Sequence, residues 1–193
     1  ACTYSMHPLK NLNVWGDGGM IVTNKKPLAK KLYLIRNHGL KNRNNVEIFG
    51  YNSRLDTIQA AVANYKMKNK LNNIANKRIK NATMLDKLLS KNKNVTTVKR
   101  LKHLKEVFHL YHINVKKRDL LQKYLIKNNV DAKVHYPIPI HLQKAAKYLK
   151  YKKGDFPIAE KMANTSLSLP VHEFIDERHV KHMVHYINKF YLK

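Results

Sequence analysis

TYSMHPLKNLNVWGDGGM, residues 3–20, combines a serine, a histidine, one lysine and a glycine-rich turn in a short segment. Lysines are spread over the whole chain, and most of them are expected at the surface. A lysine amine attacks carbonyl compounds and forms a Schiff base when its site favours the neutral amine. Whether Lys10 is a surface residue or such a reagent separates a basic binding protein from an enzyme.

The composition allows one ordinary domain, or one domain and part of another, in 193 residues. Hydrophobic residues make up 44% of the chain, which is enough for a buried core. The single cysteine, Cys2, excludes an internal disulfide and fits a reducing compartment, so we expect a cytoplasmic protein. No apolar run is long enough to span a bilayer, and the first residues lack the pattern of a signal peptide. The chain starts without methionine on a strand-like segment, which suggests that it begins within a larger protein.

The net charge of +26 first indicates an anionic partner such as nucleic acid. Lysine greatly outnumbers arginine, however, whereas recognition of phosphates and guanines relies on arginine forks. The lysines are also scattered, and asparagine is abundant, as in NRNN (42–45) and NKLNN (69–73). Drift toward A- and T-rich codons would produce this joint enrichment on a tolerant surface. We therefore expect no specific nucleic-acid partner and no membrane partner.

The first part of the chain reads as a strand followed by helices. GGMIVTN (18–24) is a β-branched run bounded by Gly and Asn and predicts a strand. Pro27 begins a helix that has Gly39 as its C-cap. Its apolar face is Leu28, Leu32 and Ile35.

A loop over residues 39–52 comes next, and the pattern is then helical from Ser53, the expected N-cap, to Ser90. Because this segment is too long for one straight helix in a compact domain, we expect a break between residues 68 and 73. Its apolar stripe consists of Leu55, Ile58, Ala61 and Val62.

After Lys91 the pattern changes to alternating strands and helices, which predicts helices packed on a small sheet. The expected strands are VTTVKR (95–100), VFHLYHINV (107–115), DAKVHY (131–136) and SLSLP (166–170). The expected helices are RDLLQKYLIKNN (118–129), with Asp119 in its first turn, GDFPIAEKMANTS (154–166) and residues 176–191.

The residues around Lys10 include some parts of a pyridoxal phosphate site. Ser5 can donate a hydrogen bond to a phosphate oxygen, and GDGG (16–19) can bring the backbone close to a ligand. By spacing alone, a lysine beside a glycine turn is more often a solvated loop residue.

The amino-acid sequences of several segments resemble those of a known family. SMHPLKNLNVWGDGG (5–19) is similar to the Schiff-base motif of the DegT/DnrJ-type sugar-nucleotide aminotransferases, which are fold-type I pyridoxal phosphate enzymes. That motif has Ser, one residue, His, two residues and Lys, and later Gly-Asp/Glu-Gly-Gly. The resemblance continues in family order, through residues 28–61, DAKVHYPIPIHLQ (131–143) and YKKGDFPIAEKMANTSLSLPVHE (151–173).

The resemblance implies an α/β protein with the fold of the fold-type I pyridoxal phosphate-dependent transferases. Residues 1–52 would be the C-terminal end of the large, cofactor-binding domain. Residues 53–90 would be a helical connector, and residues 91–193 the small α+β C-terminal domain.

The same resemblance implies roles for individual residues. Lys10 matches the lysine that binds pyridoxal phosphate as a Schiff base and then carries protons between cofactor and substrate carbons. Ser5 matches the serine that holds the cofactor phosphate. Asn52 matches an asparagine that reaches the phosphate of the cofactor bound in the neighbouring subunit. The resemblance therefore implies a homodimer with shared active sites. Arg54 matches a residue that contacts an acidic or hydroxylated sugar across the dimer. Substrate-pocket residues at the domain interface are matched by His135, Tyr136 and His141.

Each of these residues also has a purely structural interpretation. Ser5 can cap a turn, Asn52 can occupy a loop position with positive φ, and Arg54 can lie on a helix surface. His135 and Tyr136 can end a strand and pack. The remaining histidines have no metal-ligand spacing backed by carboxylates or cysteines, so we predict no metal site. We interpret them as structural or exposed: His103, His109, His112, His179, His182 and His185.

Other parts of the family pattern are missing from this sequence and would lie before residue 1. They are the Gly-Thr/Ser turn for the phosphate, the ring that stacks on the cofactor, and the aspartate of an Asp-x-Ala-(Gln/His) motif that pairs with the pyridine nitrogen. We therefore expect residues 1–193 by themselves to hold pyridoxal phosphate poorly and to be inactive.

The implied function is an aminotransferase of sugar-nucleotide metabolism, with glutamate as amino donor and a keto group of a nucleotide-linked sugar as acceptor. HPLKNLNVWGDGG (7–19), NSRLDTIQAA (52–61) and HYPIPIHLQ (135–143) are closer to members acting on 3-keto than on 4-keto sugars, which favours C3. Family dehydratases replace the Schiff-base lysine with histidine, so Lys10 favours transamination. The alternatives are a keto-inositol (aminocyclitol) aminotransferase, a non-enzymatic basic nucleic-acid-binding protein, and a regulator that keeps the fold and cofactor but senses.

Overall fold

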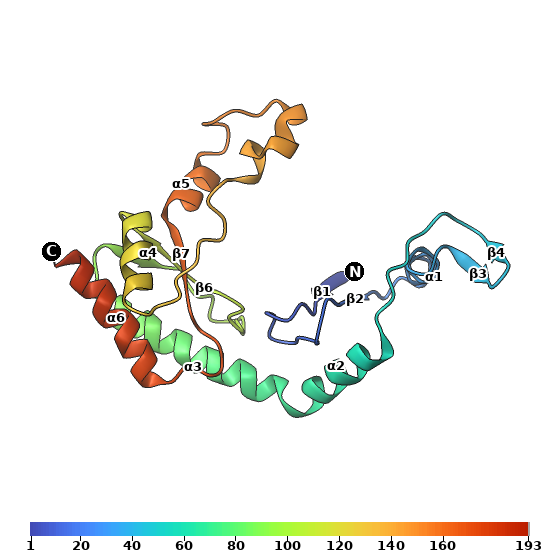
Figure 1. Cartoon of the computed structure of the whole chain (residues 1–193), viewed down its shortest axis with the longest axis horizontal. Coiled ribbons are helices and arrows are strands. Elements are labelled where there is room, and N and C mark those ends of the chain that lie inside the picture. The colour runs from blue at the N-terminus through green and yellow to red at the C-terminus, as the bar shows by residue number, and fades with distance from the viewer. Residues whose placement is uncertain (193) are drawn as a thin grey trace. The chain divides into compact units, whose positions relative to one another are not determined.

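A computed structural model describes residues 1–192 and divides the chain into two compact units (Figure 1). Unit 1 covers Ala1–Asn73, and unit 2 begins at Ile74. The boundary falls inside the segment 53–90 that the sequence assigned to a connector. The helical residues on the two sides of that boundary therefore belong to different units.

Unit 1 consists of two short antiparallel hairpins and two helices. Strand β1 (Cys2–Ser5) pairs with β2 (Gly19–Val22) from Cys2↔Val22 to Ser5↔Gly19, so both predicted strands are confirmed. Pro27 lies in the first helical turn, where the missing N–H costs nothing. The predicted loop contains a second hairpin. The remaining elements are α1 (Lys26–Ile35), β3 (Leu40–Asn42), β4 (Asn45–Val46) and α2 (Thr57–Asn69).

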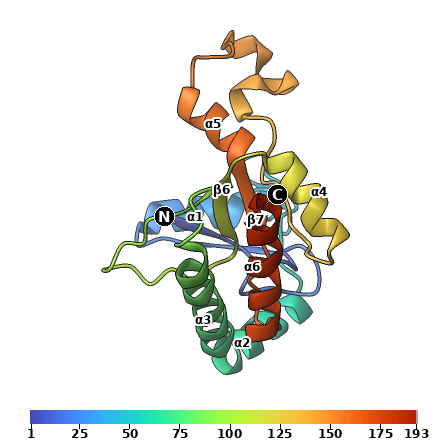
Figure 2. The ribbon, with the colours of Figure 1, turned by 90° about the vertical axis from the view of Figure 1, so that its left-hand side faces the viewer.

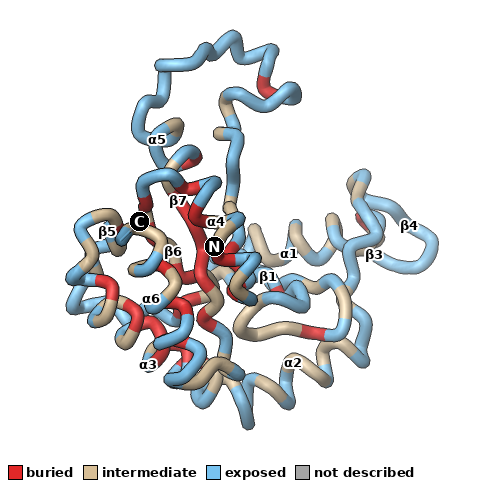
Figure 3. Tube along the Cα trace, turned by 60° about the vertical axis from the view of Figure 1, so that its left-hand side comes forward, coloured by how far each residue is buried: buried red, intermediate tan, exposed pale blue. Residues whose placement is uncertain are grey.

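Unit 1 has almost no hydrophobic core of its own. Met6 and Val14 are its buried apolar side chains among the described residues. Nearly all of its trace is intermediate or exposed in Figure 3. All residues of β1 and β2 are exposed. Because an isolated two-stranded hairpin is marginally stable in water, unit 1 buries too little apolar surface to be stable by itself.

The predicted C-cap of α1 is wrong. The helix ends at Ile35 with Arg36 as the capping residue, so Gly39 lies beyond its end. Gly39 has a φ of +72°, and a Cβ on it would lie 1.5 Å from the carbonyl oxygen of Ile48. Glycine is required there because the chain after α1 passes directly against residue 48.

The long helical segment is divided in two, as predicted, but it starts later than expected. Ser53 is not the N-cap of α2, because the helix begins at Thr57 with Asp56 as its cap. Lys70 follows the end of α2, and α3 (Leu71–Leu89) starts directly after it. The break therefore lies inside the predicted interval.

The predicted apolar stripe of α2 is only partly correct. Leu55 and Val62 are half-buried, whereas Ile58 and Ala61 are exposed. The half-buried residues of α2 are Gln59, Ala60, Val62, Ala63 and Lys66. All except Ala60 follow the spacing i, i+3, i+4, i+7 of a single helix face. The two polar members of this face, Gln59 and Lys66, contact the preceding turn.

Unit 2 is built on a three-stranded antiparallel sheet in the order β5–β6–β7. The central strand β6 (Tyr111–Val115) lies between β5 (Val95–Thr97) and β7 (Ser166–Leu169). The prediction of helices packed on a small sheet is confirmed. Besides α3, the helical elements are α4 (Arg118–Lys127), the 3-10 turns η1 (Ile140–Leu142) and η2 (Lys144–Leu149), α5 (Pro157–Thr165) and α6 (Glu177–Tyr191).

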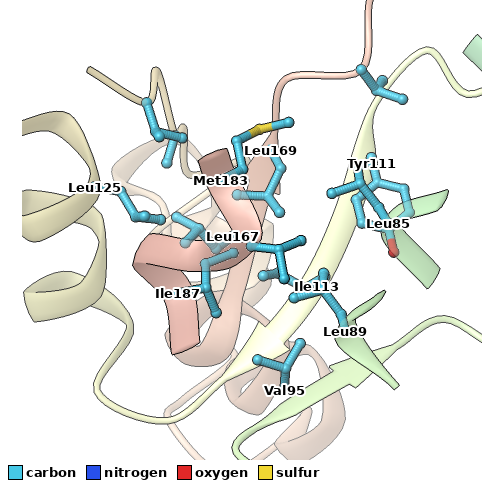
Figure 4. Close-up of a cluster of buried hydrophobic side chains, with 14 of the residues drawn as sticks. Leu85, Leu89, Val95, Tyr111, Ile113, Leu125, Leu167, Leu169, Met183 and Ile187 are labelled. Atoms are coloured by element: carbon cyan, nitrogen blue, oxygen red, sulfur yellow. The ribbon is translucent and has the colours of Figure 1, made fainter. Parts of the chain in front are cut away.

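The hydrophobic core lies between one face of this sheet and the helices α3, α4 and α6 (Figures 2 and 4). On β6 the buried residues Tyr111, Ile113 and Val115 alternate with the half-buried His112 and Asn114, which are on the other face. The helices and β7 contribute fully buried side chains, including Leu85, Leu89, Leu121, Leu125, Leu167 and Ile187.

Two predicted strands of unit 2 are corrected. Residues 131–136 do not form a strand, because only Lys133 pairs with Ser168 before the chain turns into the proline-rich segment. The strand predicted from residue 107 begins at Tyr111, since Phe108 has a φ of +49°. The carbonyl oxygen of Phe108 instead accepts a hydrogen bond from Arg78 Nη1 (3.1 Å).

The position of the core predicts unequal losses of stability when either of two adjacent leucines of α4 is replaced. Leu121 is fully buried and Leu120 is 58% exposed. We expect Leu121→Ala to lower the free energy of unfolding by about 2–5 kcal/mol, because it leaves a cavity. The matched change Leu120→Ala should cost less than about 0.5 kcal/mol. Urea unfolding of both variants measures the difference, and equal losses would contradict the assignment of this core.

Candidate active site

The turn between β1 and β2 carries Lys10. It is closed by a hydrogen bond from the Met6 N–H to the carbonyl oxygen of Gly18 (2.8 Å). Inside it, the Lys10 N–H donates to the His7 carbonyl (2.8 Å). The side chain of Asn13 donates to the Lys10 carbonyl (2.7 Å). The backbone is therefore fixed on both sides of Lys10, which is half-buried.

The helix α2 supports this turn through two side chains. The N–H of Trp15 donates to Gln59 Oε1 (2.8 Å). Lys66 Nζ donates to the side-chain oxygen of Asn13. Both contacts join residues that are far apart in the sequence, so the position of the turn depends on the covered face of α2.

The glycine turn after Lys10 has a packing role that the sequence did not reveal. A Cβ on Gly18 would lie 2.9 Å from Val14 Cγ2 and 3.1 Å from Leu55 Cδ1. Protein atoms therefore already fill the space that a side chain would need. Glycine at residue 18 is explained by close packing within unit 1, without a ligand.

Ser5 stands at the end of β1, opposite Gly19. Its Oγ accepts a hydrogen bond from the N–H of His7 (3.3 Å), and the residue is exposed. Because a hydroxyl accepts and donates at the same time, the O–H proton of Ser5 can still be donated to an anion. Ser5 thus has the contact expected of a turn cap together with the donor needed for a phosphate.

Asn52 and Arg54 are brought together with a third residue, Asn37. Arg54 Nε donates to Asn52 Oδ1 (3.1 Å), and Arg54 Nη1 donates to Asn37 Oδ1 (3.4 Å). The backbones of Asn37 and Asn52 also form an isolated β-bridge. The guanidinium is therefore held at two points, which fixes the direction of its fork. Asn37 is not among the predicted site residues, because a bridge between residues 37 and 52 leaves no local pattern in the sequence.

Unit 2 contains a shallow pocket of about 260 Å³ on the side of the sheet that faces away from the core. Two of the predicted substrate residues line it: His135 is half-buried and Tyr136 is 73% exposed. His112 of β6 and Ser166 of β7 line it as well. Apolar contacts come from Val98 and Met162.

A hydroxyl group bridges the two histidines of this pocket. Ser168 Oγ lies 2.8 Å from His135 Nδ1 and 3.0 Å from His112 Nδ1. Ser166 Oγ lies 3.4 Å from the same nitrogen of His112. Burial, and next the charge of a protonated His135, lower the pKa of His112 below its ordinary value. The pocket therefore favours a neutral His112.

The sequence pattern predicts His112 to be structural or exposed, and Ser166 and Ser168 are not among the predicted site residues. A signal was present, because alternate residues of a strand point to the same face. Ser166 and Ser168 alternate with leucines in SLSL, and His112 alternates with Tyr111 and Ile113. The antiparallel register that makes these residues neighbours is decided only in the folded chain.

His141, the third predicted substrate residue, does not line this pocket. Its Nε2 lies 3.1 Å from Glu160 Oε1, and its ring packs on Phe156 with the centroids 4.8 Å apart. The N–H of Gly154 donates to the same oxygen of Glu160 (2.7 Å). That donor first, and then His141, hold the pKa of the Glu160 carboxyl below its ordinary value. His141 thus joins the segment 137–156 to α5; a substrate role for it stays a prediction.

The class of protein follows from the similarity of this fold to solved structures. A crystal structure of a DegT DnrJ EryC1 StrS aminotransferase from Brucella abortus has a TM-score of 0.90 and 30% sequence identity. The match covers 99% of this chain and 51% of that chain. The chain therefore has the fold of the pyridoxal phosphate-dependent sugar aminotransferases, which confirms the predicted fold class.

The chain belongs to the DegT/DnrJ/EryC1/StrS aminotransferase family, which matches residues 1–188. A "Pleiotropic regulatory protein" from Geobacillus stearothermophilus is 42% identical, over 99% of this chain and 52% of the relative. The dTDP-3-amino-3,6-dideoxy-alpha-D-galactopyranose transaminase of Aneurinibacillus thermoaerophilus is 34% identical, over 90% of this chain and 47% of the relative. The chain thus spans about half the length of the curated relatives it matches.

Members of this family are pyridoxal phosphate enzymes, and the donor groups of unit 1 fit part of that cofactor. Lys10 brings a primary amine for its aldehyde, and Ser5 brings an O–H donor for its phosphate. Asn52 brings an amide that Arg54 already engages at Oδ1, so its Nδ2 is the group left to donate. By their chemistry these residues would suit the aldehyde and the phosphate, and not the pyridine nitrogen; their roles stay predictions.

Within residues 1–192, no group of three or more His, Cys, Asp or Glu side chains is placed to hold a metal ion. No helix of the same residues combines the length and apolar character needed to cross a bilayer.

The lowered pKa of His112 predicts a pH dependence of stability. The unfolded chain binds this proton more tightly than the folded one, so stability is lost as the pH falls from 6.5 through the lower folded pKa. Urea unfolding at about pH 7.5 and about pH 5.5 measures the loss. We expect a smaller loss in His112→Asn, which keeps a polar group but cannot bind the proton; an equal loss would contradict the assignment.

Proposed function

We propose that the whole protein is a pyridoxal phosphate-dependent aminotransferase of the cytoplasm. It moves an amino group from glutamate to the C3 keto group of a nucleotide-linked sugar, and it works as a homodimer with shared active sites. The observation that carries the proposal is Lys10, half-buried in a turn whose backbone is fixed on both sides, with Ser5 at the end of the adjoining strand.

Some residues of this chain would bind the cofactor, and others would bind the substrate. When bound, pyridoxal phosphate supplies an electron sink for the carbanion that forms at the amino-bearing carbon. Lys10 would hold the cofactor aldehyde through its amine, and the same amine would serve as the base and acid that moves a proton between carbons. Ser5 holds the phosphate of the cofactor in its own subunit, and Asn52 reaches the phosphate of the partner subunit's cofactor. Arg54, fixed by Asn37 and Asn52, presents its fork across the dimer to a hydroxylated or acidic sugar.

The pocket around His135 supports a sugar as substrate. Its volume of about 260 Å³ is below the range of about 300–1,000 Å³ that is usual for drug-sized ligands, so it suits one sugar ring. Imidazole, phenol and hydroxyl groups stand beside Val98 and Met162, a mixture that suits the polar edge and apolar face of such a ring. The 3-amino-sugar transaminase among the relatives supports C3 as the aminated carbon.

The chemistry of Lys10 is tested by substitution in the full-length protein. We expect Lys10→Ala to lose the visible absorbance of bound cofactor and to lower kcat by on the order of 10³-fold or more, because both covalent binding and proton transfer are removed. The matched control is Lys30→Ala on the exposed part of α1, which should keep both properties. Retained absorbance and turnover in Lys10→Ala would contradict the proposal.

The choice of substrate has its own test. Full-length protein is incubated with glutamate and, in separate reactions, with a 3-keto sugar nucleotide, a 4-keto sugar nucleotide and a keto-inositol. We expect amination of the 3-keto sugar with the highest kcat/KM. Preference for the keto-inositol would support the aminocyclitol alternative and would leave the role of Lys10 intact.

A regulatory role is the second candidate, and the name of the 42% identical relative favours it. A regulator that keeps the fold would bind cofactor and sugar nucleotide without releasing an aminated product. Single-turnover measurement distinguishes the two, since a sensor retains ligand-dependent spectral changes but consumes no glutamate.

A further inference from the structure

The register of the sheet in unit 2 places three polar residues in a line on the face that carries the pocket. His112 of β6 stands directly opposite Ser168 of β7. On the other side of β7, the N–H of Lys133 donates to the Ser168 carbonyl (3.0 Å), and the Ser168 N–H donates to the Lys133 carbonyl (2.8 Å). His135 follows two residues later and therefore comes to the same side as Ser168.

Backbone pairing thus fixes Ser168 between two imidazole rings. The side chain of Ser168 is buried at 3% exposure, so its hydroxyl has little access to water. Its Oγ lies within hydrogen-bond distance of both Nδ1 atoms, at 2.8 Å from His135 and 3.0 Å from His112. A buried hydroxyl at these distances uses both rings as its partners.

The protons of this bridge can be counted. Ser168 has one O–H proton, so when it donates to one neutral imidazole, it accepts from the N–H of the other. The two neutral rings are then held in opposite tautomers. In one of the two arrangements Ser168 donates to His112 Nδ1, and His135 Nδ1 carries a proton that it donates to Ser168.

We propose that Ser168 is a positioning residue that holds His135 in the tautomer with its proton on Nδ1. The Nε2 atom on the other side of the ring then presents a lone pair, which accepts a hydrogen bond from a hydroxyl of the sugar in the pocket. This inference rests on the proposed function for the nature of the ligand. Ser168 touches no ligand itself, since it is absent from the lining of the pocket, and acts only through His135.

The tautomer is measured without turnover, by nitrogen NMR of the full-length protein labelled with ¹⁵N-histidine. His135→Gln identifies the His135 signals. We expect a dominant Nδ1–H form in the wild type and a mixture of tautomers in Ser168→Ala. The conservative variant Ser168→Thr, which keeps the hydroxyl, should restore the Nδ1–H form.

Ser166→Ala is the matched control for this measurement. It removes a neighbouring hydroxyl of the same strand that lies 3.4 Å from His112 Nδ1, whereas the contact of His135 Nδ1 is with Ser168 Oγ. We therefore expect it to leave the His135 tautomer unchanged. An unchanged His135 tautomer in folded Ser168→Ala would overturn the proposal. If Ser168→Ala does not fold, an Nε2–H form in the wild type or in Ser168→Thr would overturn it equally.

Kinetics test whether this tautomer serves the sugar. Loss of one hydrogen bond to the ligand predicts a rise in KM for the sugar nucleotide of about 3- to 10-fold in Ser168→Ala, with kcat changed less than about twofold. In the His135→Gln background the same substitution should have no further effect, because Ser168 acts only through that ring. Equal effects in both backgrounds would show a merely structural role.

The two proposals fail in different ways. If the wild-type protein aminates no keto sugar, the proposed function is wrong, while the NMR result still decides the tautomer of His135. If turnover is normal and Ser168→Ala leaves both the tautomer and KM unchanged, the role of Ser168 is wrong and the aminotransferase proposal stands.

Discussion

The antiparallel pairing of β6 with β7 is the constraint on which unit 2 depends. Since successive residues of a strand face opposite sides, this pairing separates Tyr111, Ile113 and Val115, which face the helices, from His112. The apolar side closes the core with α3, α4 and α6. The polar side aligns His112 with Ser168 and supports the pocket. A shift of one residue in the register would bury the histidine and expose the core, so stability and the candidate site are fixed by the same register.

Unit 1 holds its chemistry in a different way. It has almost no core. The turn that carries Lys10 is positioned by hydrogen bonds with Gln59, which accepts, and Lys66, which donates, and by close packing at Gly18. Hydrogen bonds with one face of α2 thus hold the turn in place where a hydrophobic layer would otherwise do so. This explains why α2 covers a face that is partly polar and leaves Ile58 exposed. A site with so little buried surface depends on further packing to hold its geometry.

Local patterns predicted most of the elements. β-Branched runs marked β2 and β5, and the alternation of serine with leucine marked β7. Helical periodicity with a first-turn proline or acidic residue marked α1, α4 and α5. Failures occurred where distant residues decide. Gly39 does not cap α1, and its backbone instead lies against the carbonyl group of Ile48. Residues 131–136 form a single bridge, at Lys133, instead of a strand. No local pattern contains these crossings, so the sequence could not reveal them.

The sequence alone determined the family, because the resemblance lies in the residues of several segments and does not depend on their contacts in the fold. The same resemblance selected Lys10 and Ser5, whereas spacing alone favours a solvated loop lysine. Only the tertiary structure joined Asn37 to Arg54 and placed Ser168 between His112 and His135. The physical reason is distance along the chain: hydrogen bonds between residues 17 to 56 positions apart depend on strand register and helix packing, which short patterns do not encode.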